Sequence, residues 1–338
     1  MKCSVNMTRQ LALIAVLSVA SLPPVSIVAA TKAAALDKFR FGLNWAPQME
    51  MCGFFQARES GIYRNADLDV ELVHGGPSLN NAQLVAARRY DAAMGTALTT
   101  LNMRNSGVPG TTIAAMFQKS PITMVAHPGA GVSKLEDLAG RPVAIPATGR
   151  PIQWAWLKGK FGFDDSQLRP FSFNPTAFVV DKNAIRQGYA TEDGYYLGKA
   201  LGEEPVSLLL ADRGYPDYAT TIFTSDAVVA DRRDVLGRFV AASRDGFAQC
   251  LAGDPSLAIS AIATENAEQP PDLSKFKLTQ MKRQKLVDGG DAASSGIGTM
   301  SDARWASIFA AMSEIGLYPK DMQFRSAYNL DFAQAKSK

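Results

Sequence analysis

Residues 41–76 read FGLNWAPQMEMCGFFQARESGIYRNADLDVELVHGG, and the order of their patterns decides the fold. An apolar strand runs into Asn44 and Trp45, a helix with a Phe-Phe pair follows, and after a glycine break a second strand ends in Gly-Gly-Pro. Strand, helix and strand in this order are typical of an α/β domain. We therefore predict that two strand ends and two helix starts converge on one cleft.

The chain begins with the features of an export signal. Lys2 and Arg9 supply a positively charged start, and the apolar run 11–19 is much shorter than the about 20 residues that a membrane span needs. Small residues that suit a signal peptidase occur up to residue 35. We predict that residues 1–35 are a cleavable signal peptide and that the mature protein is soluble in the periplasm.

An uncleaved membrane anchor is the alternative to a cleaved signal. Pro23-Pro24 interrupts the apolar run before it could span a bilayer, which favours cleavage. Cys3 precedes the apolar run, whereas a lipid-carrying cysteine would lie at the cleavage point.

The composition is that of a globular protein with a large core. The chain has 338 residues, of which 47% are hydrophobic and 20% are charged, enough for two ordinary domains. The net charge of +3 falls close to zero once the basic signal is removed. A nucleic-acid partner usually requires a strong basic excess, so we predict none.

Two cysteines, Cys52 and Cys250, remain after export. They could form a disulfide in an oxidising compartment, or they could be two buried thiols. They are far apart in the sequence and their spacing requires neither outcome.

Strands and helices alternate along the rest of the chain. Strands are predicted at 91–94, 111–116, 121–126, 141–146, 205–210 and 218–223, and helices are predicted from Pro77 onward and at 134–140, 151–161, 231–250, 255–264 and 302–315. This alternation predicts mostly parallel sheets with helices on both faces.

Four segments together resemble one family. LNWAPQMEMCGFFQARESGIYRNADLDVELVHGGPS (43–78) is similar to the opening motif of the periplasmic substrate-binding proteins of ABC importers for nitrate, sulfonate, taurine and thiamine-pyrimidine precursors. KLEDLAGRPVAIP (134–146) resembles the start of that family's second domain. Residues 187–195 resemble its late second-domain segment, and Thr224-Ser225-Asp226 with 239–242 resembles the return to the first domain.

The resemblance implies the fold and the mode of action. The fold would be the two-lobed, type II periplasmic binding protein fold, α/β with mostly parallel sheets and two crossover strands. Lobe 1 would comprise 37–122 and 224–338, and lobe 2 would comprise 123–223. The solute would bind between the lobes, which close around it by a hinge, and a membrane permease would recognise the closed form.

On the first lobe, the candidate ligand residues follow strand ends. Asn44 and Trp45 lie at such an end, where the indole would stack on a planar ring, unless Trp45 belongs to the core. The turn Gly75-Gly76-Pro77-Ser78 opens a helix, and its backbone N–H groups would hold a ligand edge, unless it is a plain tight turn. Thr96 follows the next strand and would hydrogen-bond the ligand.

On the second lobe, Thr148 and Arg150 form the matching site, where Arg150 would pair with an anionic group. Trp154 is the nearby indole that we expect to face the cleft. Glu192 and Asp193 occupy the segment where the pyrimidine-binding branch often shows Thr-Asn-Glu-Pro. They would accept hydrogen bonds from a ring amine, or form a solvated acidic turn.

Glu50 stands with Met49 and Met51, where many relatives carry Asn and His. Glu50 is a further candidate ligand residue, and the two methionines would provide an adaptable apolar wall. The missing His and the altered 191–194 segment both argue for a ligand different from the family's pyrimidine.

The sequence thus predicts a monomeric solute-binding protein without metal or cofactor, whose partners are a small molecule and a permease. The ligand would be planar or aromatic, pyrimidine-like or an aromatic acid, and a sulfonate, taurine or nitrate is the alternative. A related family of thiamine-pyrimidine synthases shares the fold and acts with bound pyridoxal phosphate and iron. That chemistry would need a reactive Lys or His and a cysteine-rich metal motif, whereas this chain has only His74 and His127 and no clustered cysteines. A ligand-sensing lobe that serves a separate receptor is the third hypothesis.

Overall fold

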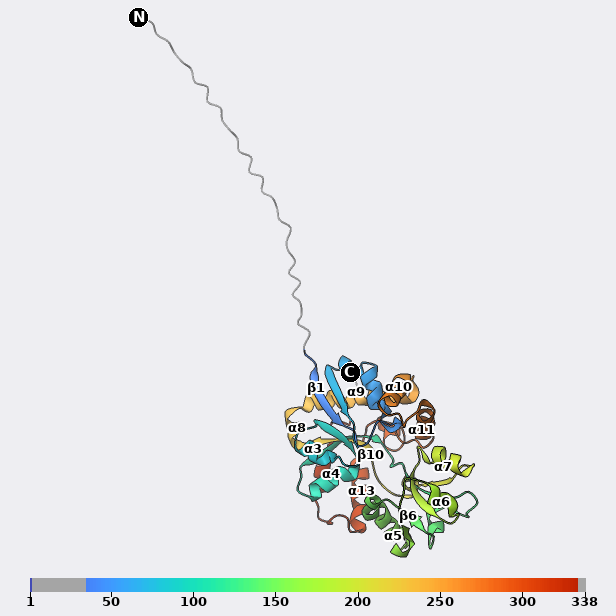
Figure 1. Ribbon diagram of the computed structural model, residues 1–338. Helices are drawn as coiled ribbons and strands as arrows, with labels where there is room; N and C mark the ends of the chain where they lie inside the picture. Colours follow the sequence, from blue (N-terminus) through green and yellow to red (C-terminus); the bar gives the residue numbers. More distant parts are fainter. Residues whose placement is uncertain (2–34, 334–338) are drawn as a thin grey trace. The chain divides into compact units, whose positions relative to one another are not determined.

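The computed structural model describes residue 1 and residues 35–333, so the predicted signal peptide lies almost entirely outside the described residues. Strands and helices alternate along the described chain (Figure 1). The strands are β1 Asp37–Gly42, β2 Leu68–Val73, β3 Ala92–Gly95, β4 Gly110–Phe117, β5 Ile122–Ala126, β6 Val143–Ala144, β7 Leu168–Arg169, β8 Ile185–Tyr189, β9 Val206–Leu209 and β10 Ala219–Ser225. The α-helices are α1 Cys52–Glu59, α2 Ile62–Asn65, α3 Asn81–Ala86, α4 Ala97–Asn105, α5 Ala155–Phe161, α6 Thr176–Val180, α7 Asp193–Leu201, α8 Asp226–Asp231, α9 Arg233–Ala252, α10 Ser256–Glu265, α11 Pro271–Arg283, α12 Ala292–Ser295 and α13 Asp302–Glu314.

The first sheet has the strand order β2-β1-β3-β10-β4. β1 runs parallel to β2 and β3, and its register against β2 pairs Asp37 with Leu68 and Gly42 with Val73. β10 is inserted antiparallel between β3 and β4. The carboxyl ends of β1, β2 and β3 therefore lie at one edge of this sheet.

The second sheet repeats the pattern in the order β7-β6-β8-β5-β9. β6 is parallel to β7 and β8, and β5 is antiparallel to β8 and β9. Two connections join the sheets: residues 118–121 lead from β4 to β5, and residues 210–218 lead from β9 to β10. We call the part built on the first sheet the first lobe and the part built on the second sheet the second lobe. The two-lobed α/β fold is thus confirmed. The sheets are mixed rather than mostly parallel, because β5 and β10, which enter from the other lobe, run antiparallel to both of their neighbours. The limits 37–122, 224–338 and 123–223 stay predictions.

Aromatic side chains fill the core of the first lobe. Phe39 and Phe41 on β1 pack against Phe239 on α9, and the ring centroids of Phe39 and Phe239 are 4.2 Å apart. Phe54 on α1 completes the cluster against Phe41. The two phenylalanines of β1 are two residues apart, so both point to the face that α1 and α9 cover. The predicted helix at 231–250 is found as α9, where it buries this apolar face.

A disulfide joins Cys52 at the start of α1 to Cys250 near the end of α9. Both residues are fully buried, and their Cα atoms are 6.2 Å apart. The pairing resolves the choice that the sequence left open between a disulfide and two buried thiols.

Some elements differ from the prediction. β7, β8 and α11 were not predicted, because β7 is two residues long, β8 (IRQGY) is polar, and α11 is rich in lysine. The helix expected to start at Pro77 begins instead at Asn81. Among the described residues, no helix has both the length and the apolar character that crossing a bilayer requires.

Candidate functional site

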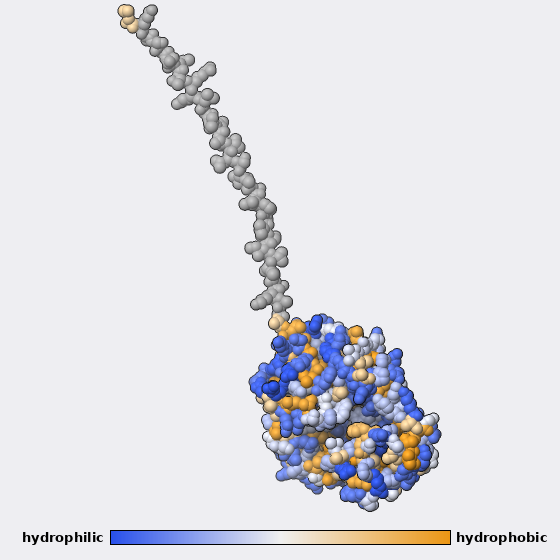
Figure 2. Space-filling view, viewed as in Figure 1, coloured by the Kyte–Doolittle hydropathy of each residue, from blue (hydrophilic) through white to orange (hydrophobic). Residues whose placement is uncertain are grey.

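The carboxyl ends of the parallel strands in both sheets point toward the boundary between the lobes. Thr191, two residues after β8, donates its hydroxyl hydrogen to Glu50, which lies in the 3-10 turn Met49–Met51 after β1. Figure 2 shows that the surface is hollowed between the two lobes. Ligands of α/β sheets bind outside the carboxyl ends of the strands, so this boundary is the candidate site.

Trp45 is exposed at the end of β1, with 41% of its surface accessible. The Gly75 N–H donates to the Trp45 carbonyl oxygen over 3.0 Å, which ties the loop after β2 to the loop after β1. A Cβ atom on Gly75 would lie 2.3 Å from the carbonyl oxygen of Leu43 and 2.5 Å from the Trp45 nitrogen. Glycine is therefore required at position 75 because the two loops touch through their backbones. The neighbouring Asn44 side chain is also exposed.

The turn after β2 differs from the expected ligand-binding turn. The N–H group of Gly75 is already bonded to Trp45, so it is not free to hold a ligand. Pro77 and Ser78 are exposed in a turn that precedes α3 rather than opening it, and Gly76 has open space around its Cα. The N-cap of α3 is Asn80, because its short side chain accepts a hydrogen bond from the Gln83 N–H.

Asn81, which the sequence analysis did not single out, connects the strand ends. Its amide nitrogen donates to the carbonyl oxygens of Leu43 at 3.1 Å and Met94 at 3.2 Å. One side chain thus positions the backbone that leads from β1 to Trp45 and from β3 to Thr96.

Thr96 is the N-cap of α4 and forms a capping box with Thr99. Its hydroxyl oxygen accepts from the Leu98 N–H at 3.2 Å, so the helix uses one lone pair and the hydroxyl hydrogen stays available to a ligand. Asp217, at the end of the second connection, lies near this helix start. Burial raises the pKa of Asp217 well above its ordinary value, against the opposing effects of Arg304 and the Ala97 amide.

On the second lobe, Thr148 and Arg150 follow β6 and both are exposed. Arg150 opens the helical turn Arg150–Trp154, and no hydrogen bond or ion pair joins it to another described side chain. The pairing of Arg150 with an anionic ligand group stays a prediction.

The expectation for Trp154 was wrong. Its side chain is 2% exposed and packs beside Phe163, while its indole N–H donates to Asp165 at 2.7 Å. Both contacts lie within the second lobe, and the indole is buried there, so it does not face the cleft.

A buried charge cluster crosses the boundary between the lobes. Lys277 on α11 is fully buried, and its Nζ atom lies 3.3 Å from Glu50 and 3.3 Å from Glu192. Burial alone would lower the pKa of Lys277, but the two carboxylates outweigh it and raise the pKa. Burial raises the pKa of Glu192, against the attraction of Lys277. The cluster holds two carboxylates and one ammonium group.

Asp193 does not join this cluster. It lies beneath the start of α7, where its carboxylate accepts a hydrogen bond from the Thr123 hydroxyl at 2.7 Å. Burial raises its pKa to about 7, although the bonds from Thr123 and the Tyr189 amide act against the shift. The expectation that Asp193 faces the ligand is therefore corrected: its carboxylate anchors α7 to β5, and of the acidic pair Glu192 alone reaches the other lobe.

Tyr189, at the end of β8, lies among the acidic groups of the boundary. Burial raises the pKa of its hydroxyl, and the nearby Glu50, Glu192 and Asp217 raise it further. The phenol therefore stays protonated and can donate a hydrogen bond.

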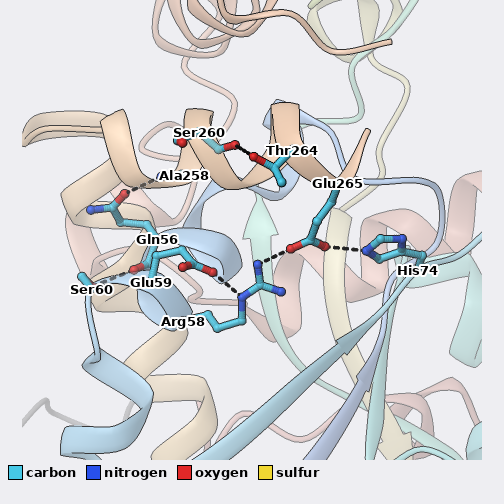
Figure 3. Close-up of polar contacts among 9 residues, drawn as sticks. All are labelled: Gln56, Arg58, Glu59, Ser60, His74, Ala258, Ser260, Thr264 and Glu265. Atoms are coloured by element: carbon cyan, nitrogen blue, oxygen red, sulfur yellow. Dashed lines mark hydrogen bonds and ion pairs between the residues drawn. The ribbon is translucent and has the colours of Figure 1, made fainter. Parts of the chain in front are cut away.

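A second polar network holds the end of β2 beside the site. Figure 3 shows Glu265, at the end of α10, between His74 and Arg58. The His74 Nε2 and Glu265 Oε2 atoms are 2.6 Å apart, and Arg58 on α1 pairs with the other carboxylate oxygen. Burial opposes ionisation of Glu265, but the bonds from Arg58 and His74 prevail and lower its pKa. This network joins α1, β2 and α10 next to the Gly75 turn.

Lys277, Asp217 and Tyr189 were missed by sequence reasoning. One signal was present: Lys277 stands four residues from both Leu273 and Met281, within the apolar stripe of its helix. Within residues 35–333, no group of three or more His, Cys, Asp and Glu side chains is arranged to hold a metal ion.

The two lobes have the fold of the periplasmic binding proteins. The periplasmic aliphatic sulphonate binding protein SsuA from Escherichia coli has the same fold, with a TM-score of 0.66 and 13% identity over 89% of this chain and 94% of that one. The family model described as NMT1/THI5 like matches residues 48–258. This chain belongs to the NMT1/THI5-like family.

Two curated relatives are similar in sequence. The riboflavin-binding protein RibY of Chloroflexus aurantiacus is 24% identical over 311 residues, which cover 89% of this chain and 88% of that protein. The 4-amino-5-hydroxymethyl-2-methylpyrimidine phosphate synthase THI11 of Saccharomyces cerevisiae is 25% identical over 149 residues, which cover 43% of this chain and 44% of that protein.

Proposed function

We propose that this chain is the solute-binding component of an ABC import system and captures a small planar or aromatic solute by hinge closure. A ligand that contacts both lobes shifts the equilibrium toward the closed form. The shift is set by the binding free energy of the contacts that the ligand makes only in that form. A membrane permease would then recognise the closed form. We further propose that the protein acts as a monomer in the periplasm.

The observation that carries the proposal is the exposed Trp45 at the end of β1. A large aromatic side chain is costly to leave in water, yet the Gly75 contact holds this loop in place after the strand end. An indole offers a flat apolar face, on which a planar ring stacks with its edges free for hydrogen bonds. The match to a relative named as riboflavin-binding, over most of both chains, supports a planar ligand.

The charges at the boundary favour a ligand that donates hydrogen bonds. Glu50 and Glu192 share one ammonium group, and Asp217 adds a third carboxyl near the start of α4. A helix start is the place where an anionic ligand would be most stable, and here an acidic side chain of the protein already lies close to it. These acids support a ring with amine or imide N–H groups.

A sulfonate, taurine or nitrate ligand is the second candidate. It is favoured by the exposed Arg150 at the end of β6 and by the fold shared with SsuA. Arg150 would have to outweigh the acids of the boundary, so we rank this candidate below the planar ring.

We propose that the protein is not an enzyme. A relative that matches most of the chain, RibY, is named as a binding protein, whereas the match to the yeast synthase covers less than half of either chain. The disulfide between Cys52 and Cys250 supports the proposed periplasmic location, because such bonds persist in oxidising compartments.

A thermal-shift screen of the exported protein tests the proposal. The panel contains riboflavin, aminopyrimidines, thiamine, aromatic carboxylates, taurine, alkyl sulfonates and nitrate. A ligand at about 100 times its dissociation constant stabilises the folded state by about 2.7 kcal/mol, which shifts the melting temperature measurably. We expect a rise with a planar compound.

A rise with alkyl sulfonates or nitrate alone would replace the planar ligand by the second candidate. If nothing on the panel shifts the melting temperature, the protein is denatured and the released small molecules are weighed. A planar compound released in that step would support the proposal, and an aliphatic anion would contradict it.

A further inference from the structure

The two connections between the sheets lie on one side of the boundary. In the first sheet, the two connections are attached to β4 and β10, which lie at the opposite end of the sheet from β2. In the second sheet, the two connections are attached to β5 and β9, which lie at the opposite end of the sheet from β7. The segments that follow β2 and β7 are therefore farthest from the hinge.

The segment after β7 carries two phenylalanines, Phe171 and Phe173. β7 is parallel to β6, which is parallel to β8, so its carboxyl end points toward the first lobe, as the contact of Thr191 with Glu50 shows for β8. The segment that carries Phe171 and Phe173 therefore leaves β7 at the end that points toward the first lobe. Neither residue was a candidate in the sequence analysis.

The Phe173 ring is unusually exposed, with 82% of its surface accessible. It packs edge-on against Phe171 with ring centroids 5.3 Å apart. Figure 2 shows an apolar patch over α6, on the same face of the molecule as the hollow between the lobes. A contiguous exposed apolar patch on a folded protein marks a candidate interaction site.

The segment around these rings is held in place. Phe171 lies under the Arg186 guanidinium, which is 5.2 Å from the ring centroid. The Asn174 side chain accepts from the Thr176 N–H at 2.9 Å, and the Asn174 N–H donates to the Ser172 hydroxyl at 3.1 Å. The loop thus presents the Phe173 ring on a fixed base.

We infer that Phe173, backed by Phe171, is the second-lobe half of an aromatic clamp whose first-lobe half is Trp45. The inference rests on the proposed function and specifies its ligand: a ring system long enough to reach the outer end of the cleft and flat enough to be covered on both faces. When the lobes close, the phenyl ring covers the ligand on the side opposite the indole. Closure buries the exposed ring and the ligand together, which couples binding to the closed state.

The test compares Phe173→Ala with Val180→Ala. Val180 is the matched control, because it is a similarly exposed apolar residue, 76% accessible at the end of α6, but it does not follow a strand end. Binding of riboflavin, 4-amino-5-hydroxymethyl-2-methylpyrimidine and benzoate to the purified protein is measured by calorimetry. We expect Phe173→Ala to weaken the planar compound that binds by about tenfold, and Val180→Ala to leave it unchanged.

Two further variants separate the clamp from general apolar contact. Phe173→Trp retains a flat face and should keep the affinity. Phe173→Leu has no flat face and should lose most of the affinity that Phe173→Ala loses. The double variant Trp45→Ala with Phe173→Ala should lose less binding free energy than the sum of the losses in the two single variants. The reason is that a ligand ring covered on one face only is already weakly bound.

The outcomes distinguish the clamp from the proposed function. If a planar compound binds and Phe173→Ala leaves its affinity unchanged, the clamp is wrong and the patch belongs to another partner, such as the permease. If Val180→Ala weakens binding as much as Phe173→Ala, general apolar contact replaces the clamp. If only aliphatic anions bind the wild-type protein, the clamp falls together with the planar ligand.

Discussion

Lys277 on α11 lies 3.3 Å from Glu192, the residue before α7, and the two side chains belong to different lobes. The same ammonium group lies 3.3 Å from Glu50 after β1. One buried lysine therefore links the first lobe to the second at the point where Thr191 also crosses. The pair places a polar contact, rather than an apolar one, at the boundary that must open for a ligand to enter.

Replacing Lys277 by Met is expected to lower the free energy of unfolding by about 3–5 kcal/mol, because two buried carboxylates lose their counter-charge. Urea unfolding measures the loss. Lys275→Met, on the exposed side of the same helix, is the control and should change little. Equal stabilities of the two variants would show that Lys277 does not hold the acids. Adding Glu50→Gln to Lys277→Met should recover part of the loss.

Trp45→Ala is expected to weaken binding of a planar ligand by about tenfold or more while the fold stays intact. The control is Leu257→Ala on α10, because Leu257 is exposed to a similar extent, 48% against 41% for Trp45. Calorimetry gives the affinity, and circular dichroism checks the fold. Unchanged affinity in Trp45→Ala would remove the stacking role of the indole.

Gly75→Ala should displace the loop that carries Trp45, because the added Cβ atom would meet the backbone of Leu43 at 2.3 Å. We expect a loss of about 1–3 kcal/mol in unfolding free energy and weaker ligand binding. Gly76→Ala is the matched control, since no atom lies within 4 Å of its added Cβ. The backbone contact would be unimportant if both variants behaved alike in urea unfolding and in binding.

Asp193→Asn should change how stability depends on pH. The pKa of Asp193 is raised to about 7 in the folded protein by burial, whereas an unfolded Asp titrates near about 3.9. Between these values the folded state binds more protons, so this group lowers the wild-type stability as pH rises through the window.

The melting temperature of Asp193→Asn relative to the wild type should therefore rise from pH 4 to pH 7 and level off above it. Asn can still accept the Thr123 hydroxyl. Asp245→Asn, on an exposed part of α9, serves as the control. A difference that is flat across this pH range would contradict the raised pKa.

Removing the disulfide by Cys52→Ala with Cys250→Ala should cost about 2–5 kcal/mol in unfolding free energy. The bond spans 198 residues, so it restricts a large part of the unfolded chain. Urea unfolding of the wild type with and without a reductant gives an independent measurement. Thiol labelling of the unfolded, unreduced protein should find neither cysteine free, and two labelled thiols would disprove the bond.

Local patterns predicted most of the strands and the position of Trp45. The alternation of apolar strands with helices depends on neighbours a few residues apart, and parallel strands place their carboxyl ends at one edge. Trp45 could therefore be placed at a strand end before its exposure was known. The same logic failed for Trp154, because its burial depends on the second lobe's core and on Asp165 beyond the end of its helix.

The sequence by itself determined the α/β class, the family resemblance and the strand ends where Trp45, Thr96 and Arg150 stand, because these follow from patterns within single segments. The tertiary structure alone decided which acid faces the other lobe, that Lys277 pairs with Glu50 and Glu192, and that Cys52 meets Cys250. Those contacts join residues that are 85 or more positions apart in the chain. Charge and burial at such contacts are set by how whole elements pack, which no local pattern records.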